Sequence, residues 1–218
     1  LKGVDIATSI AGFFKSNHCQ ILGIQGPPGT GKSTITANCV SKLASYGFKI
    51  AISSNSHSVI NNLLKKIQKI LSNQENEVKI FKSENRKEPN EELAKKSINT
   101  IQTKKVADII SDGCIIGGTV WALCLEELKD KFDLLVIDEA GQMSMANLMI
   151  MSGCAKSILL VGDQQQLSHV SEALHDSDAG LSSLEYWLSM KKVIPSNLGV
   201  FLNKSWRMHP RITSIVSD

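Results

Sequence analysis

The chain has 218 residues, with 42% hydrophobic and 21% charged residues and a formal net charge of +3 at pH 7. This composition is typical of a soluble globular protein, and no apolar run approaches the ~20 residues that a membrane-spanning helix needs. A net charge this small does not by itself indicate nucleic-acid binding, so any such function has to be argued from motifs.

The start of the chain and its cysteines bear on its cellular context. Leu1 stands where an initiating Met would, which predicts a fragment or a processed chain. The first residues lack the basic and apolar regions of a signal peptide. Five cysteines, an odd number with no C-x-x-C pair, predict reduced and mostly buried thiols of a cytosolic protein and disfavour a zinc site.

The first predicted strand, residues 21–25, leads into the octapeptide G-P-P-G-T-G-K-S at residues 26–33. This octapeptide fits the phosphate-binding loop pattern G-x-x-x-x-G-K-[ST]. Its glycines let successive backbone N–H groups point at phosphate oxygens, and the helix predicted over 32–46 directs its positive end toward the anion. We therefore expect a nucleotide to be bound by Gly26, Pro27, Gly29, Thr30, Gly31, Lys32, Ser33 and Thr34.

The second predicted strand, residues 49–53, is followed by a helix over 59–71. Residues 73–90 are polar and charged and predict an excursion with a mobile loop, after which a helix is expected over about 91–110. Residues 61–110 hold 11 Lys and Arg against 7 Asp and Glu. A solvated helical surface explains this excess of positive charge, and a basic face near a nucleic-acid path is the alternative.

The third and fourth predicted strands cover residues 114–118 and 134–138, and the fourth ends in two acids. Asp138 faces the phosphate loop across the sheet, where it could hold Mg²⁺ through water, and Glu139 could accept a proton from an attacking water. The alternative is that both acids only favour the positive end of a helix predicted to begin near Met143. The phosphate loop upstream favours the catalytic interpretation.

The fifth predicted strand, residues 157–161, follows a helix over 144–152 and ends in the polar turn G-D-Q-Q-Q-L at 162–167. A glutamine amide can donate to a terminal phosphate and accept from a water, which suits Gln166 as a sensor. Three glutamines in a solvated turn are the alternative, and spacing does not decide between the two.

Strands that alternate with helices in this way predict an α/β fold. Most of the strand runs are too continuous for half-exposed strands, which indicates a mainly parallel sheet flanked by helices on both faces. Ligands in such folds bind at the carboxyl ends of the strands. We therefore expect the phosphate loop, the two acids and the glutamines to meet at one edge of the sheet.

Four motifs occur in order along the chain: G-P-P-G-T-G-K-S, D-E-A-G-Q at 138–142, G-D-Q-Q-Q-L, and W-R-M-H-P at 206–210. Together they resemble the first RecA-like motor domain of superfamily 1 helicases, in the branch of the RNA-surveillance and senataxin-type helicases. S-N-S-H-S-V-I-N-N-L-L at 54–64 and G-G-T-V-W-A-L at 117–123 are similar to bacterial proteins that fuse a RecB-like nuclease to such a helicase. The likeness covers roughly residues 20–218 and implies a RecA-like P-loop NTPase fold.

The resemblance implies that the chain uses ATP and Mg²⁺. Lys32 would contact the β- and γ-phosphates, while Ser33 and Asp138 would hold Mg²⁺. Glu139 would be the base that activates the attacking water.

Other residues would respond to the nucleotide. Gln142 and Gln166 would couple the state of the γ-phosphate to movement, and Arg207 would stabilise negative charge in the transition state. Trp206 stands where the family often has a Tyr that stacks near adenine, and core packing is the alternative role for this ring. The family also has an upstream glutamine that reads adenine, but Gln20 and Gln25 lack the required spacing.

Nucleic-acid contacts in this family come from the loops after the second and fourth strands of the domain. By resemblance, the candidates in this chain are Asn55, Ser56, His57, Asn61, Thr119 and Trp121. Ser56, His57 and Asn61 fit the first of these loops, and Asn55 remains a candidate because the match around residues 54–57 is ambiguous by two positions. Trp121 would offer a face on which a base can stack.

The implied organisation is an ATP-binding motor domain over residues 1–200, with a polar insertion at about 72–112. Residues 201–218 would begin a second RecA-like domain or the linker to it, and that second domain would complete the ATP site. The implied partners are single-stranded DNA or RNA and a fused or associated nuclease, with no membrane, in the bacterial cytoplasm at the nucleoid. A nucleotide-dependent switch or assembly module without unwinding activity is the alternative function, because motor-like folds are also used as switches.

Overall fold

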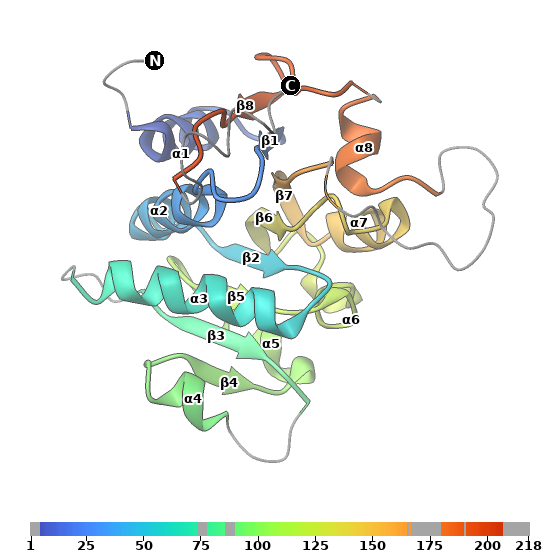
Figure 1. The fold of residues 1–218 in the computed structure, drawn as a ribbon. Coiled ribbons are helices and arrows are strands. Elements are labelled where there is room, and N and C mark those ends of the chain that lie inside the picture. The colour runs from blue at the N-terminus through green and yellow to red at the C-terminus, as the bar shows by residue number, and fades with distance from the viewer. Residues whose placement is uncertain are drawn as a thin grey trace.

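The computed structural model describes residues 5–73, 78–85, 90–164, 166, 180–189 and 191–206. These residues form one eight-stranded parallel sheet with helices on both faces (Figure 1). The strand order is β4-β3-β5-β2-β6-β7-β1-β8. The sheet confirms the α/β, mainly parallel architecture expected from the sequence.

Five strands lie where the apolar runs predicted them: β1 (Ile21–Gln25), β2 (Ile50–Ser53), β5 (Ile115–Gly117), β6 (Phe132–Asp138) and β7 (Ala155–Gly162). Three further strands were not predicted: β3 (Ile80–Ser83), β4 (Asn99–Ile101) and β8 (Gly199–Phe201). All three are short and lie toward the two edges of the sheet, where neighbouring backbone rather than an apolar pattern decides whether a segment pairs.

The helices that follow the strands begin close to their predicted positions. They are α2 (Lys32–Ser45), α3 (His57–Leu71) and α7 (Met145–Ser152), and the structure adds α1 (Ile6–Ser16), α6 (Val120–Leu123) and α8 (Ser183–Trp187). A 3₁₀ turn at Glu126–Leu128 precedes β6.

The single helix expected over about 91–110 is wrong. This stretch forms α4 (Glu91–Ala94), the strand β4, a 3₁₀ turn at Thr103–Lys105, and α5 (Val106–Ile109). Ser97 has a φ of 56°, which ends the helical path, and the extended residues after it pair with β3. The composition suits a helix, but the free hydrogen-bonding edge of β3 makes the extended form more favourable here.

Two apolar cores lie on the two faces of the sheet. α1, α2 and α3 cover one face, and α5, α6, α7 and α8 cover the other. Successive residues of a strand alternate between the cores, so that Ile50 and Ile52 join the first and Ala51 the second. Every residue of β2 is therefore buried, as predicted for a sheet covered on both sides.

The elements inside and after the expected motor domain continue the same sheet. β3 and β4 fall within the stretch expected to be a polar insertion, and β8 pairs with β1. The N–H of Leu202 donates to the carbonyl of Gln25 at 2.8 Å, which keeps the chain against the sheet past residue 201. The domain limits at about 72–112 and at 200 stay predictions.

The described residues also bear on the thiols and on membrane insertion. All five cysteines are free, and Cys39, Cys114 and Cys154 are buried. Burial raises the pKa of both Cys39 and Cys154 to about 12. Within the described part of the chain, no helix is long and apolar enough to cross a membrane.

Candidate nucleotide site and nucleic-acid interface

The loop between β1 and α2 is built as a phosphate cradle. Gly29 and Gly31 have φ values of 81° and 88°, a conformation that glycine adopts without strain. A Cβ on Gly26 would lie 2.7 Å from the hydroxyl of Thr30 and 2.9 Å from the carbonyl oxygen of Leu202, so this position has no room for a side chain. α2 begins at Lys32, and its N-cap residue Gly31 provides no side-chain cap, which leaves the first N–H groups of the helix available to an anion.

Lys32 lies within the curve of this loop. Its ammonium donates to the carbonyl of Gly26 at 2.5 Å and to that of Pro27 at 3.4 Å. A phosphate that enters the cradle can replace these carbonyls as acceptor. The loop is therefore shaped and charged for a phosphate chain, as the motif predicts.

The two acids end β6 in a buried and strained setting. Asp138 is 5% exposed, and its backbone neighbour Glu139 has a φ of 56°, which is unusual for a residue with a side chain. Burial and the charge of Glu139 raise the pKa of Asp138 to about 6, although the N–H of Glu139 and the charges of Lys32 and Lys66 act against this rise. The raised pKa means that bringing a cation to Asp138 relieves an unfavourable buried charge.

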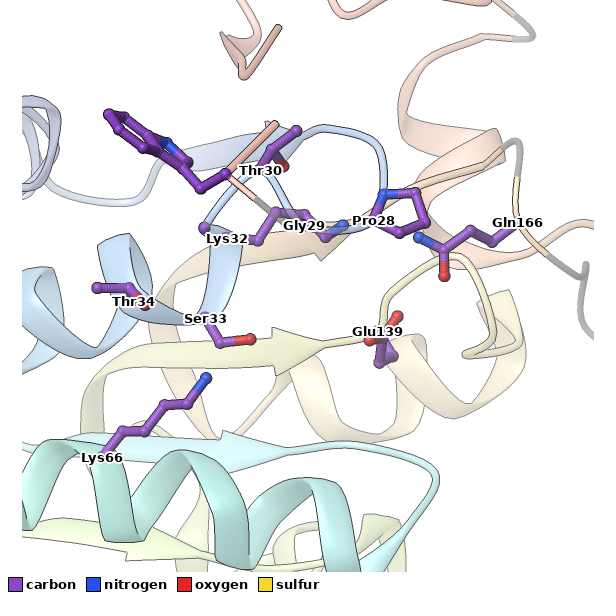
Figure 2. Close-up of a pocket in the computed structure, with 11 residues that line it drawn as sticks. Pro28, Gly29, Thr30, Lys32, Ser33, Thr34, Lys66, Glu139 and Gln166 are labelled. Atoms are coloured by element: carbon purple, nitrogen blue, oxygen red, sulfur yellow. The ribbon is translucent and has the colours of Figure 1, made fainter. Parts of the chain in front are cut away.

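One cavity of about 370 Å³ collects most of the residues predicted to bind and hydrolyse nucleotide (Figure 2). Its predicted lining residues are Gly29, Thr30, Gly31, Lys32, Ser33, Thr34, Glu139, Gln166 and Trp206. The amide of Gln166 donates to Asp163 at 3.3 Å. Figure 2 shows the side chain of Gln166 on the Pro28 side of the cavity.

Four of the predicted residues that the structure describes are not in the lining. Gly26 and Pro27 contribute their carbonyls to Lys32 from behind the loop, and Asp138 is buried behind Glu139. Gln142 is tied through its carbonyl to Asn55. Arg207 lies outside the described residues, as do residues 208–218.

Two residues line this cavity that the sequence reasoning missed, Pro28 and Lys66. Lys66 lies on α3, and Figure 2 shows its side chain pointing toward Ser33 from the side opposite the phosphate loop. No local motif marks this lysine among its neighbours on the helix. Only the packing of α3 beside α2 brings it to the site.

A second cavity of about 580 Å³ adjoins the phosphate loop. Thr30, Gly31, Thr34 and Trp206 line both cavities, and Ile6, Ile35 and Phe201 add apolar surface to the second. Trp206 is 72% exposed, its backbone N–H donates to the carbonyl of Gly29 at 2.8 Å, and the ammonium of Lys204 lies 4.1 Å from its ring centre. The ring is therefore not packed in the core, which was the alternative role considered for it.

The buried glutamine next to the loop has a structural role. The amide of Gln25 donates to the carbonyl of Lys192 at 2.8 Å and accepts from the N–H of Ile194 at 2.7 Å. Both ends of this side chain are therefore engaged, in agreement with the spacing argument against Gln25 as a reader of adenine.

The residues predicted to contact nucleic acid come together at the carboxyl ends of β2 and β5, which are neighbours in the sheet. Asn55 and His57 are exposed, and Ser56 caps α3 by accepting from the N–H of Ser58 at 3.2 Å. Thr119 begins α6, and Trp121 on that helix is 81% exposed. Asn61 faces inward, and its side-chain oxygen is buried without a hydrogen-bond partner among the described residues.

The loops that carry residues of the two sites are joined by a direct contact. The side-chain amide of Asn55, in the loop after β2, donates to the carbonyl of Gln142, in the loop after β6. A shift of either loop therefore changes a hydrogen bond made by the other.

Comparison with known proteins places this geometry in a family. A family model described as an AAA domain matches residues 10–177. The chain belongs to the AAA domain family. Two curated relatives are the DNA replication ATP-dependent helicase/nuclease DNA2 of Gallus gallus, 27% identical over 202 residues, and the regulator of nonsense transcripts 1 homolog of Drosophila melanogaster, 26% identical over 235 residues. They cover 88% and 89% of this chain, which spans 19% of each relative's length.

Solved structures share the fold at low sequence identity. An Arterivirus nonstructural protein 10 helicase in complex with DNA aligns with 98% of this chain and 42% of that chain, at a TM-score of 0.53 and 13% identity. The DUF1998 helicase MrfA bound to DNA aligns with 91% of this chain and 27% of that chain, at a TM-score of 0.52 and 9% identity. The RecA-like fold expected from the sequence is confirmed, and the names of the two curated relatives agree with the expected resemblance to superfamily 1 helicases.

Proposed function

We propose that this chain is the ATP-binding half of an ATP-dependent helicase or translocase, with DNA as its substrate. The observation that carries this proposal is the single cavity bordered by the phosphate loop, Glu139 and Gln166. The exposed loop residues after β2 and β5 lie at the same edge of the sheet, and the contact between Asn55 and Gln142 links the two regions. Such a link is what a motor needs to couple nucleotide state to its grip on a strand.

The residues at the cavity fit Mg²⁺ with a nucleoside triphosphate. The hydroxyl of Ser33 and the carboxylate of Asp138 would hold the ion, since Mg²⁺ prefers oxygen ligands. When bound, Mg²⁺ would supply positive charge that offsets the negative charge of the outer phosphates. The buried, disfavoured charge of Asp138 is the feature of this chain that fits the ion best.

The chain's own side chains divide the remaining work. Glu139 would accept a proton from water, Lys32 would turn from the loop carbonyls to the outer phosphates, and Gln166 would sense the terminal phosphate. Lys66 would face the phosphates from the α3 side. Arg207 keeps its proposed role as a cation on the transition state.

The apolar second cavity supports a place for the nucleobase. It adjoins the phosphate loop, and the exposed ring of Trp206 lies at the boundary of the two cavities. A flat ring at this boundary suits stacking on adenine. We propose that Trp206 replaces the adenine-reading glutamine in holding the base.

We propose DNA rather than RNA as the substrate because of the names of the curated relatives. Seven of the eight curated relatives are named DNA replication helicase/nucleases, and one is a regulator of nonsense transcripts. We propose that single-stranded DNA contacts Asn55, Ser56, His57, Asn61, Thr119 and Trp121. We also propose that a second RecA-like domain completes the ATP site and that a nuclease domain is fused to the motor or associates with it.

ATP hydrolysis tests this function. The rate is measured on the intact protein that carries this chain, with and without single-stranded DNA and RNA, and with Glu139→Gln. We expect stimulation by DNA and a loss of about a hundredfold or more with the variant, because the general base is removed. A rate of ATP hydrolysis that neither nucleic acid nor Glu139→Gln changes would contradict the proposal.

A nucleotide-dependent switch would use the same cavity and is the second candidate. The exposed Trp121, with 81% of its surface open next to the loop after β2, favours the motor. A strand-displacement assay separates the two, because a switch hydrolyses ATP without releasing a strand.

A further inference from the structure

A cluster of charged side chains lies beneath the nucleic-acid loop, outside the nucleotide cavity. Lys82, on β3, is fully buried, and Glu84, just past the end of that strand, has 3% of its side chain exposed. Above them, His57 opens α3 with 56% of its side chain exposed. Buried lysine and glutamate are rare in proteins because each loses its hydration.

Distances within the cluster define which atoms interact. The ammonium of Lys82 lies 3.0 Å from Nδ1 of His57 and donates to the carbonyl of Ser83 at 3.1 Å. The carboxylate of Glu84 lies 3.9 Å from the Lys82 ammonium and 3.8 Å from Nδ1 of His57. The ammonium therefore hydrogen-bonds the ring, and the carboxylate balances its charge from farther away.

The chemistry of these groups selects one form of the imidazole. An ammonium has donors and no acceptor, so Nδ1 at 3.0 Å must accept. A neutral ring whose Nδ1 accepts carries its hydrogen on Nε2. The exposed side of His57 then offers a donor, which suits a phosphate oxygen.

Backbone hydrogen bonds and helix packing constrain the positions of the clustered residues. The N–H of Glu84 donates to the carbonyl of Ile101 at 2.9 Å, which ties it to β4. His57 sits on the first turn of α3, whose Ile60 and Leu64 are buried in the core. Two well-packed elements thus bring the lysine and the histidine together.

We propose that Lys82 and Glu84 are positioning residues that fix the orientation and tautomer of His57, so that its Nε2–H donates to a phosphate of single-stranded nucleic acid. This inference rests on the proposed nucleic-acid contact at His57. A stabilising role alone explains the pair less well, because an apolar pair of similar volume would avoid the cost of burying two charges.

A double-mutant cycle tests the inference with this chain and a fluorescent oligothymidylate, read by anisotropy. One arm is Lys82→Met with Glu84→Gln, which removes both charges together and leaves no buried charge without its partner. The other arm is His57→Ala, and the third variant combines all three changes. His18→Ala is the control, because His18 is also exposed but lies before β1, at the opposite edge of the sheet.

We expect His57→Ala to weaken oligonucleotide binding about tenfold, because it removes a charge-assisted hydrogen bond. The paired change should weaken binding about threefold, because it only misaligns that hydrogen bond. In the His57→Ala background the paired change should cost nothing further, because the pair acts through the ring. His18→Ala should bind like the wild type. Equal losses from the paired change in both backgrounds would overturn the positioning role.

Nuclear magnetic resonance gives a readout that does not depend on binding. Two-bond ¹H–¹⁵N correlations should show His57 in the Nε2–H form in the wild type and in a mixture of forms after the paired change. An unchanged tautomer overturns the inference. If the wild type binds no oligonucleotide, the proposed nucleic-acid function fails together with the positioning role, whereas binding that His57→Ala leaves intact overturns the inference alone.

Discussion

At the scale of single residues, Lys66 is a cation that the fold brings to the phosphate loop, whereas the loop itself was recognised from its sequence motif. It lines the phosphate cavity and points toward Ser33 (Figure 2). Its neighbour Lys65 instead pairs with Glu92, away from the cavity. Two adjacent lysines on one helix therefore have different surroundings, which makes each the control for the other.

We expect Lys66→Ala to weaken ATP binding to this chain about fivefold and ADP binding much less, because we propose that the lysine faces the terminal phosphate. Titration with fluorescent analogues of both nucleotides measures the two affinities. Lys65→Ala should change neither. Equal weakening of ATP and ADP would place Lys66 away from the terminal phosphate.

Asp138 should make the nucleotide-free protein less stable as pH rises. Its pKa is raised from 3.8 to about 6, so the folded state binds a proton more tightly than the unfolded state. This contribution is fully present below about pH 4 and is lost as pH rises through 6, at a cost of up to about 3 kcal/mol. In urea titrations without Mg²⁺, Asp138→Asn should therefore raise the free energy of unfolding at pH 7 and have little effect at pH 4. A destabilised variant at pH 7 would contradict the assignment.

At the scale of elements, the close packing of α3 on β5 depends on a glycine. A Cβ on Gly117 would lie 2.7 Å from the side chains of both Ile60 and Leu64. Gly117→Ala should lower the free energy of unfolding by about 1–3 kcal/mol because the core has to shift. Gly12, within α1, has nothing within 4 Å of such a Cβ, so Gly12→Ala should raise stability by up to about 1 kcal/mol. Urea titrations of both variants measure the difference, and effects of the same sign would argue against this packing.

Elements also show where sequence patterns succeed. Continuous apolar runs identified the five strands that carry the phosphate loop, the acids and the nucleic-acid loops. The strands β3, β4 and β8 escaped because their formation depends on pairing with neighbouring strands rather than on a local apolar run. The helix predicted around Ser97 was wrong for the same reason. The local preference of this segment for a helix is weaker than the stabilisation that it gains by pairing with a neighbouring strand.

At the scale of the whole molecule, the described lining of the nucleotide cavity comes from the loops and helices at the carboxyl edge of one sheet, including Lys66 on α3, and from Trp206, which follows β8. We therefore expect this chain alone to bind ATP weakly and to hydrolyse it slowly, because the proposed opposite wall belongs to a second RecA-like domain. Steady-state hydrolysis by the chain and by the intact protein that carries it measures the difference. Equal rates would show that the chain forms a complete site.

The reactivity of the cysteine thiols tests whether the whole domain is folded as described. Iodoacetamide should modify the exposed Cys19 in the native protein, while Cys39 and Cys154, whose pKa values burial raises to about 12, should react only on unfolding. Peptide mass spectrometry after a time course distinguishes them. Early modification of Cys39 would contradict the packing of α2 against the sheet.

The sequence by itself determined the phosphate loop, the acids Asp138 and Glu139, and the parallel α/β sheet, because these features depend on residue types at short, fixed spacings. The tertiary structure alone decided the role of Gln25, the approach of Lys66 to the phosphate cavity, and the burial of Lys82 beneath His57. These contacts join residues 25 to 169 positions apart along the chain or depend on the packing of one helix against another. No local pattern encodes such distances, because they are set only when the helices and strands pack together.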